Sequence, residues 1–484
     1  MSTMSQKNSS PVIFEFLFYA FLLLLFFSLG SDQDLHLRVQ YGAGFGLLGL
    51  CLISPGVISW KMVSGKWTLA ALSIFLAYEY IRAAFMKLGG GSEQSLYGPQ
   101  TGYYLQALWR WTYSFGCFFL AYQLFCRRSQ AGRLHNFLSL AGFFLAIVAI
   151  PPLMRHPGVP PVYHWGSGNF AQSGFFPPIF YAHPWAGKYL VEQFAHVNYV
   201  GDVMAIGFFS ALGLLVYHFE LFRDAWHTEK SRGSSRIPLK VLQPFFLFLT
   251  VCLVITTSIL LLFSRGTILC FSLLFFGFLL GILLWFRSRA YLQLVLAVVL
   301  ITGGFNLWSG NLKGVWKELQ TLSGENADAQ HRTSFSTNKE GARRALGMHR
   351  DYPLWGVGTG AYKDFAQHYA VEKAPDGQFD FASYESMNHY LQLLAEEGIG
   401  AYLYFLFLAV YLLEAAIRLF KVKSRFQYIL SLSLLSAVVM IFSHGAFNHL
   451  LERVSMSVLT YIIMGASLGL LRDDFDKVLF SKTK

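Results

Sequence analysis

A histidine stands at the start of an apolar run, beside several other polar residues. His389, Gln392 and Glu396 recur at helical spacing, so they share one side of a predicted helix. Polar groups at membrane depth are costly and usually serve a function, although a single histidine at a membrane boundary is more often structural. An imidazole can act as a general base near neutral pH, above all if Glu396 or Glu397 holds its other nitrogen. We therefore predict His389 as a catalytic base, supported by Asn388 and Glu396.

Arg265 lies in the shortest interruption between two apolar runs, within the sequence Ser264–Thr267 (SRGT). An arginine at such a boundary can simply extend its guanidinium to headgroup phosphates. Alternatively, a fixed guanidinium binds a substrate phosphate through two parallel hydrogen bonds, a geometry that lysine lacks. The sequence favours phosphate binding for Arg265.

A second group of polar residues opens another apolar run and includes Asn198 and Asp202. A carboxylate facing lipid would be costly, so Asp202 is expected to face the helix bundle and to pair there, for example with an arginine. Arg82 and Arg110 lie within or near two other runs. The sequence leaves open whether these two arginines line a cavity or extend to the membrane surface.

Two further patterns favour structural roles. The glycine-rich sequence Trp355–Gly360 (WGVGTG) resembles a nucleotide-binding loop only superficially, because it follows no predicted strand and contains no lysine. A tight turn is favoured there over an anion-binding turn. Near the C-terminus, His444, Asn448 and His449 are interpreted as groups that hydrogen-bond between helices.

These residues sit in a chain whose composition is that of an integral membrane protein. Of 484 residues, 54% are hydrophobic and only 13% are charged, whereas soluble domains carry about 25% charged residues. The apolar residues fall in runs long enough to cross a bilayer as helices. We predict an all-α polytopic membrane protein, a single domain over 1–484 with about twelve transmembrane helices. The predicted spans are 12–30, 41–59, 68–86, 104–125, 136–154, 196–218, 241–263, 267–286, 290–308, 391–417, 428–446 and 454–471.

The distribution of lysine and arginine predicts the orientation of these spans. Basic residues concentrate in alternate short loops, which therefore remain in the cytoplasm together with both chain termini. The net charge of +11 mostly reflects this bias and favours a membrane surface over nucleic acid as the partner. Five cysteines lie in or beside the spans and suggest neither a disulfide framework nor a metal site.

Two insertions are predicted on the opposite, outward side. Residues 155–195 are rich in Pro, Gly and aromatic residues, as expected for an irregular lid on the membrane surface. Residues 310–390 form the larger insertion and contain a short helix, which begins at the capping box Thr337–Glu340 and ends near Asp351, ahead of Pro353.

Three motifs in this order resemble the O-antigen ligase and polymerase superfamily. They are Ser264–Thr267, the segment from Pro353 to Tyr362, and Asn388–Gly400 (NHYLQLLAEEGIG). The resemblance implies a bacterial inner-membrane glycosyltransferase that uses no metal and no cofactor. Such an enzyme takes a glycan from undecaprenyl pyrophosphate and passes it to an acceptor hydroxyl on the periplasmic side, where both insertions would lie.

The resemblance also assigns roles to residues. Arg265 matches the arginine of the first motif, and His389 matches the histidine that ends the large loop. The family has a further arginine upstream of the glycine-rich stretch, but this sequence departs from that pattern, so Arg332, Arg343 and Arg344 all compete as the second pyrophosphate-binding arginine. Guanidinium groups would stabilise the leaving pyrophosphate while His389 accepts the acceptor's proton, which predicts inversion at the anomeric carbon.

Several functions remain compatible with these residues. An O-antigen ligase that transfers the glycan to the lipid A core is the first expectation. A polysaccharide polymerase acting on a growing glycan and a protein O-oligosaccharyltransferase use the same chemistry with other acceptors. A twelve-helix secondary transporter is the non-enzymatic alternative; it should show broken helices near the middle of the membrane, and the large outward loop fits it poorly. A non-catalytic scaffold would leave Arg265 and His389 unexplained.

Overall fold

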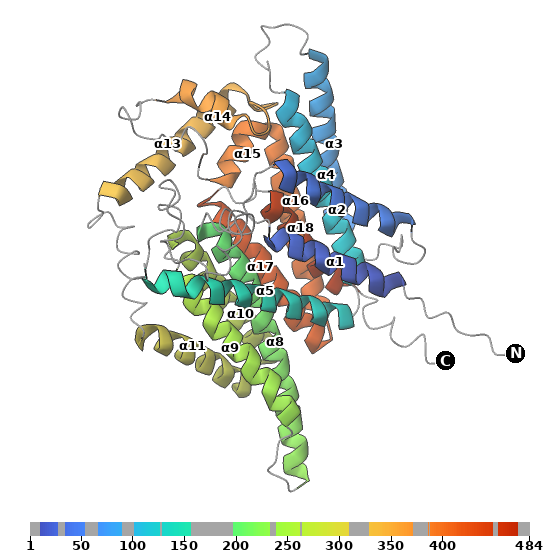
Figure 1. Cartoon of the computed structure of the whole chain (residues 1–484), viewed down its shortest axis with the longest axis vertical. Helices are drawn as coiled ribbons and strands as arrows, with labels where there is room; N and C mark the ends of the chain where they lie inside the picture. Colours follow the sequence, from blue (N-terminus) through green and yellow to red (C-terminus); the bar gives the residue numbers. More distant parts are fainter. Residues whose placement is uncertain are drawn as a thin grey trace, which may run out of the picture.

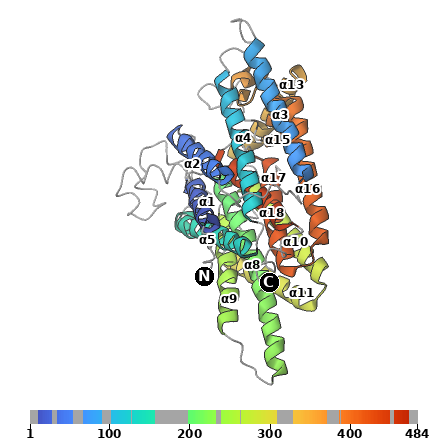
Figure 2. The same ribbon diagram turned by 90° about the vertical axis from the view of Figure 1, so that its right-hand side faces the viewer.

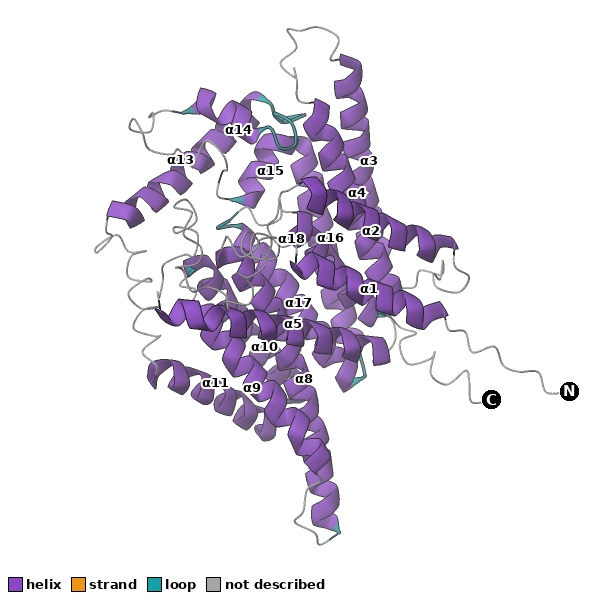
Figure 3. Ribbon diagram, viewed as in Figure 1, coloured by secondary structure: helices purple, strands orange, loops and turns teal. Residues whose placement is uncertain are grey.

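The computed structural model describes residues 10–27, 34–53, 66–89, 101–125, 128–155, 197–232, 239–261, 264–308, 329–370, 386, 388–448 and 454–472. Within these ranges the chain consists of helices joined by turns and short loops, without a strand (Figure 3). The all-helical class predicted from the sequence is therefore confirmed. The predicted lid falls outside this description, apart from Arg155 at the end of a helix.

A described helix overlaps each predicted apolar run, but several bounds differ: the run 196–218 lies in a helix that extends to Ser231, and the run 41–59 overlaps a helix over Asp34–Ile53. In chain order the described helices are α1 (Ser10–Phe27), α2 (Asp34–Ile53), α3 (Lys66–Gly89), α4 (Thr101–Leu124), α5 (Arg128–Arg155), α8 (Val197–Ser231), α9 (Leu239–Leu261), α10 (Arg265–Phe286), α11 (Arg289–Trp308), α13 (Ala329–Asp351), α14 (Tyr362–Phe365), the 3₁₀ turn η4 (Ala366–Tyr369), α15 (His389–Glu397), α16 (Ile399–Lys421), α17 (Arg425–Gly445) and α18 (Val454–Leu470).

Among the described residues, six helices are long and apolar enough to cross a membrane. These stretches are Lys66–Phe85, Asn198–Ser231, Leu239–Leu261, Gly266–Phe286, Ile399–Lys421 and Arg425–Gly445. The chain is therefore a multi-pass helical membrane protein. That the chain has about twelve membrane spans remains a prediction.

One predicted span is wrong as a continuous helix. The run 391–417 is divided between α15 and α16 at Gly398, whose φ of 55° lies in the left-handed region and ends α15. Because α16 alone has 23 residues, it can cross the bilayer without α15. The break thus lies at the end of a full-length span rather than in its middle.

The predicted helix of the large insertion is present and ends at Asp351, as Pro353 required. Its start is different, because α13 already begins at Ala329. The capping box Thr337–Glu340 therefore lies inside the helix instead of opening it.

Helix α8 forms the centre of the bundle and contacts α5, α9 and α17, whereas α4 packs against α18 and α3 against α16. At the crossing of α5 and α8 two glycines touch, since a Cβ on Gly142 would lie 2.7 Å from the Cα of Gly207. Such small residues allow membrane helices to approach closely. This close contact fixes the position of α8 relative to α5. The first turn of α8 contributes to the site described below.

The long axis of the molecule separates two ends. Helices α13, α14 and α15 lie at one end beside the tips of α3 and α4, and the C-terminal end of α8 projects from the other (Figures 1 and 2). Helix α5 runs across this axis in both views. The described part of the large insertion therefore lies at the end of the molecule away from the C-terminal end of α8, with α13 and α14 packed against α15.

Candidate active site

The N-terminal ends of α8 and α10 are joined by hydroxyl and amide groups. Ser264, the N-cap of α10, donates its hydroxyl to Asn198 Oδ1 of α8 at 2.6 Å. The same hydroxyl lies 2.8 Å from the Thr267 hydroxyl and accepts the Thr267 backbone N–H. These bonds fix the backbone of Arg265, the first residue of α10, against the start of α8. Asn198 thus holds the start of α10, and its supporting role in catalysis stays a prediction; the Arg265 side chain lies outside the described residues.

The start of α15 is fixed to the end of α17. Asn388 caps α15, because its side-chain oxygen accepts the N–H groups of Tyr390 and Leu391 at 3.0 Å. Its amide nitrogen donates to the Ala446 carbonyl at 2.8 Å. The backbone N–H of His389 donates to the Asn448 carbonyl at 3.2 Å. The His389 side chain, 1% exposed, is thereby held at a defined point of the bundle.

Asp202 faces the bundle, as predicted, but its partner is not an arginine. The carboxylate oxygen Oδ1 lies 2.8 Å from Nδ1 of His444 on α17, and both side chains are fully buried. The interpretation of His444 as a group that hydrogen-bonds between helices is confirmed. The sequence did not indicate His444 as the partner, because the two residues are 242 positions apart and meet only where α17 packs against α8.

The glycine-rich turn of residues 355–360 is structural, as favoured from the sequence. Val357 and Gly358 donate their N–H groups to the carbonyls of Ala395 and Glu396 at the end of α15. Gly356 has a φ of 66°, and a Cβ there would lie 2.2 Å from the Glu396 carbonyl oxygen. Glycine is therefore needed at position 356, where the two backbones come close together. The N–H groups of Val357, Gly358 and Gly360 donate to residues of α15 and are not directed at a nucleotide phosphate.

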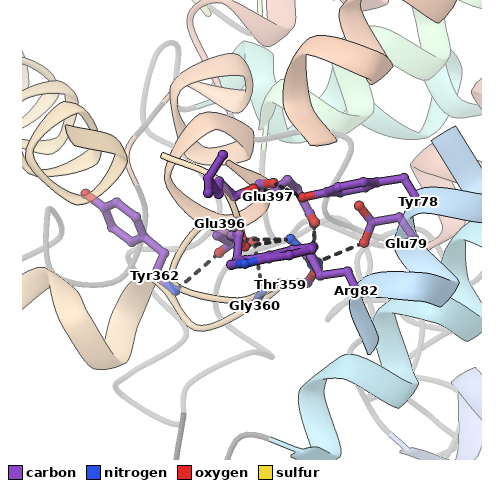
Figure 4. Close-up of polar contacts among 10 residues, drawn as sticks. Tyr78, Glu79, Arg82, Thr359, Gly360, Tyr362, Glu396 and Glu397 are labelled. Atoms are coloured by element: carbon purple, nitrogen blue, oxygen red, sulfur yellow. Dashed lines mark hydrogen bonds and ion pairs between the residues drawn. The ribbon is translucent and has the colours of Figure 1, made fainter. Parts of the chain in front are cut away.

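Glu396 completes the attachment of this turn through its side chain (Figure 4). Its carboxylate accepts the N–H of Gly360 at 2.8 Å, the N–H of Tyr362 at 3.3 Å and the Gln392 amide at 3.1 Å. Burial raises the pKa of Glu396 to about 7, and the Gly360 N–H opposes this shift by favouring the charged form. We predicted that Glu396 or Glu397 would hold the His389 ring; instead, these bonds tie Glu396 to the turn.

Glu397 and Arg82 form the adjoining ion-pair network (Figure 4). The fully buried guanidinium of Arg82 pairs with Glu79 at 3.1 Å and with Glu397. It also donates to the carbonyls of Trp355 and Glu396, both at 3.1 Å. The Thr359 hydroxyl accepts from Arg82 and donates to Glu397. Arg82 therefore does not extend to the membrane surface, and it joins α3 to the turn and to α15.

The arginines competing for the second phosphate contact occupy different environments. Arg344 is 1% exposed, and its Nε donates to Glu340 at 3.0 Å. Arg343 is 45% exposed and pairs more loosely with the same carboxylate, at 3.4 Å. The side chain of Arg332 lies outside the described residues. Of the two arginines that can be compared, Arg344 is the one turned into the molecule.

Sequence reasoning missed two features of this site. The Arg82 network was signalled only by Glu79 and Arg82, an opposite-charge pair one helical turn apart inside an apolar run. The contact of His444 with Asp202 joins residues separated by 242 positions, and no local pattern indicates it. Among the described residues, no cluster of three or more His, Cys, Asp or Glu side chains could hold a metal ion.

The site can be compared with known families. Residues 249–406 match the family model described as O-antigen ligase. The match covers the start of α10, helix α13, the glycine-rich turn and α15 with His389, so the resemblance found in the sequence is confirmed for this region. A search of curated proteins finds no match to the chain.

Proposed function

We propose, from the premise that residues 249–406 belong to the O-antigen ligase family, that this chain is a membrane glycosyltransferase of the ligase type. It moves a glycan from undecaprenyl pyrophosphate to a hydroxyl of an acceptor such as the lipid A core. The transfer takes place on the periplasmic side of the bacterial inner membrane. Both chain termini face the cytoplasm.

One observation carries this proposal. The starts of α10 and α15 are held against the first turn of α8 and the end of α17 by the bonds of Ser264, Asn388 and His389. The segments that contain Arg265 and His389 are more than a hundred residues apart in the sequence. Because α8 and α17 pack against each other and are joined by the Asp202–His444 pair, these two attachments support one site in which an arginine and a histidine act on the same substrate.

The proposed reaction uses these residues in defined roles. His389 accepts the proton of the acceptor hydroxyl as its oxygen forms a bond to the anomeric carbon. The bond between that carbon and the pyrophosphate oxygen breaks, and the leaving group takes the electron pair. Arg265 and a second arginine stabilise the resulting negative charge, which is larger in the transition state than in the bound donor. Attack from the face opposite the leaving group inverts the anomeric carbon.

Burial favours Arg344 as the second arginine. A guanidinium shielded from water interacts more strongly with a phosphate than one in bulk solvent. Arg344 has this environment and lies on α13, which packs against α15. Arg343 faces outward, and Arg332 remains a candidate.

The transporter alternative receives less support. Its expected signature is a helix broken near the middle of the membrane. The break at Gly398 instead precedes a full-length span, and the Ile399 N–H beside it donates to the carbonyl of Leu354, which directly precedes the glycine-rich turn, at 3.0 Å. The break therefore allows the end of α15 to bond to the segment around the glycine-rich turn.

A reconstituted assay tests the function. Purified chain in lipid vesicles receives radiolabelled glycan on undecaprenyl pyrophosphate together with a lipid A core acceptor. The proposal expects label on the acceptor. Label that appears only on longer undecaprenyl-linked chains would identify a polymerase, label on an added Ser- or Thr-containing protein would identify a protein-glycosylating enzyme, and an unchanged donor would contradict the transferase assignment.

A further inference from the structure

His444 and Asp202 form a fully buried pair for which the proposed reaction has no role. They come from α17 and α8, and the distance from Nδ1 to Oδ1 is 2.8 Å. Burying such a pair does not by itself stabilise a protein, because apolar residues of the same volume often do so equally well. Polar pairs at membrane depth are usually kept for function. The surroundings of the ring indicate what this function is.

The other edge of the His444 ring lies against the first turn of α10. With Nδ1 directed at Asp202, the ring presents Nε2 and Cδ2 to Gly266, where a Cβ would lie 2.9 Å from both atoms. Any side chain at this position would displace the ring or the helix. Gly266 directly follows Arg265, so the ring fixes the position of the backbone that carries the predicted phosphate-binding arginine.

The residues that follow His444 fix the start of α15 in the same way. The carbonyls of Ala446 and Asn448 accept from Asn388 and His389. Gly445 lies beside His389, because a Cβ on Gly445 would be 3.7 Å from the histidine Cβ. The end of α17 therefore contacts the predicted base on one side and the start of α10 on the other.

We infer that His444, oriented by Asp202, is a positioning residue that sets α10 and α15 at the separation the reaction needs. The inference rests on the proposed function. Misplacing a reacting group by about 1 Å can cost roughly 10²-fold in rate. Loss of the ring should therefore lower kcat while leaving KM for the donor nearly unchanged, since the residues that bind the donor are still present.

The test compares purified variants in the reconstituted assay, per folded molecule. His444→Ala should lower kcat by about 10- to 100-fold with KM within about threefold of the wild type. His444→Asn keeps a donor for Asp202 but removes the ring edge from Gly266, so it should show a similar loss even if the alanine variant folds poorly. Normal kcat in His444→Asn would overturn the inference.

Gly266→Ala provides an independent arm, because it leaves Asp202 and His444 in place. It should lower kcat to a similar degree, and the double variant Gly266→Ala with His444→Ala should be no worse than either single variant, since the ring that the new Cβ meets is gone. Additive losses would contradict a shared contact.

A matched control is His135 of α5, which contacts the same helix α17 at another point. His135 is fully buried and bonds to the Leu430 carbonyl and the Ser433 hydroxyl of α17, about 20 Å along the helix from His444. His135→Ala should lower thermal stability without the change in kcat; an equal kcat loss would show a merely structural role for both histidines. An inactive wild type would contradict the proposed function, whereas an active wild type with an unaffected His444→Asn would contradict only the inference.

Discussion

At the scale of single residues, buried charge is the feature that most constrains this protein. Arg82 is fully buried and pairs with Glu79 and Glu397, which are also buried. Transfer of such groups from water costs several kcal/mol per ion, and only close pairing compensates for it. The network is therefore a point at which one substitution leaves uncompensated charge.

Arg82→Met should sharply lower the thermal midpoint of the detergent-solubilised protein. Removing one partner of a buried ion pair costs about 3–5 kcal/mol, because the other charge stays desolvated. Adding Glu79→Gln and Glu397→Gln should restore part of the loss. Arg232→Met is the matched control, since Arg232 is 70% exposed in its pair with Glu229 and should have no measurable effect. Equal midpoints for Arg82→Met and Arg232→Met would contradict the network.

The sequence allowed us to predict which polar residues face away from lipid, but it did not show which residues they bond to. That Asp202 faces the bundle followed from the cost of a lipid-exposed carboxylate. Its pairing with His444 could not follow, because it depends on how α8 and α17 cross. Glu396 shows the same limit: its side of the helix was predictable, but its bonds to Gly360 and Tyr362 come from a turn thirty-odd residues away.

At the scale of elements, helix α13 directs two neighbouring arginines to different surroundings. Consecutive residues of an α-helix point about 100° apart. Arg344 is consequently buried, while Arg343 is exposed, although both bond to Glu340. The two residues give a matched pair of variants on one helix.

Arg344→Gln should lower glycan transfer by roughly 10²-fold, the usual loss when one group that stabilises transition-state charge is removed. Arg343→Gln should transfer at about the wild-type rate. Both rates are measured with the undecaprenyl-linked donor at saturation, after normalising for folded protein. A large loss in Arg343→Gln alongside normal transfer in Arg344→Gln would reverse the assignment.

Element boundaries were predictable where local rules decide them. Pro353 ended α13 where expected, and the apolar runs became helices. The break at Gly398 escaped prediction because apolar residues continue beyond it. Glycine is required there both by the positive φ and by close contact, since a Cβ would lie 2.6 Å from the Gly356 nitrogen and the Leu354 oxygen.

At the scale of the whole molecule, the two ends of the long axis are predicted to face opposite sides of the membrane. Helix α13 lies at one end and the C-terminal end of α8 at the other (Figure 1). The distribution of lysine and arginine in the short loops predicts that α13 faces the periplasm and that the C-terminal end of α8 faces the cytoplasm.

Single cysteines in a cysteine-free background test that orientation. Lys339→Cys on α13 should react with a membrane-impermeant maleimide in intact spheroplasts, and Lys230→Cys at the end of α8 should react only after permeabilisation. Both side chains are exposed, so access depends on the side of the membrane alone. The opposite labelling pattern would place the site in the cytoplasm.

The central claim is tested most directly by the rate of glycan transfer in purified His389→Ala and Arg265→Ala. We expect each substitution to lower kcat by about 10²–10⁴-fold, as loss of a general base or of a charge-stabilising group does. His368→Ala, an exposed histidine of the same insertion, and Arg287→Ala, at the opposite end of α10, are matched controls that should keep wild-type rates. Near-normal transfer by both His389→Ala and Arg265→Ala would contradict the proposed catalytic site.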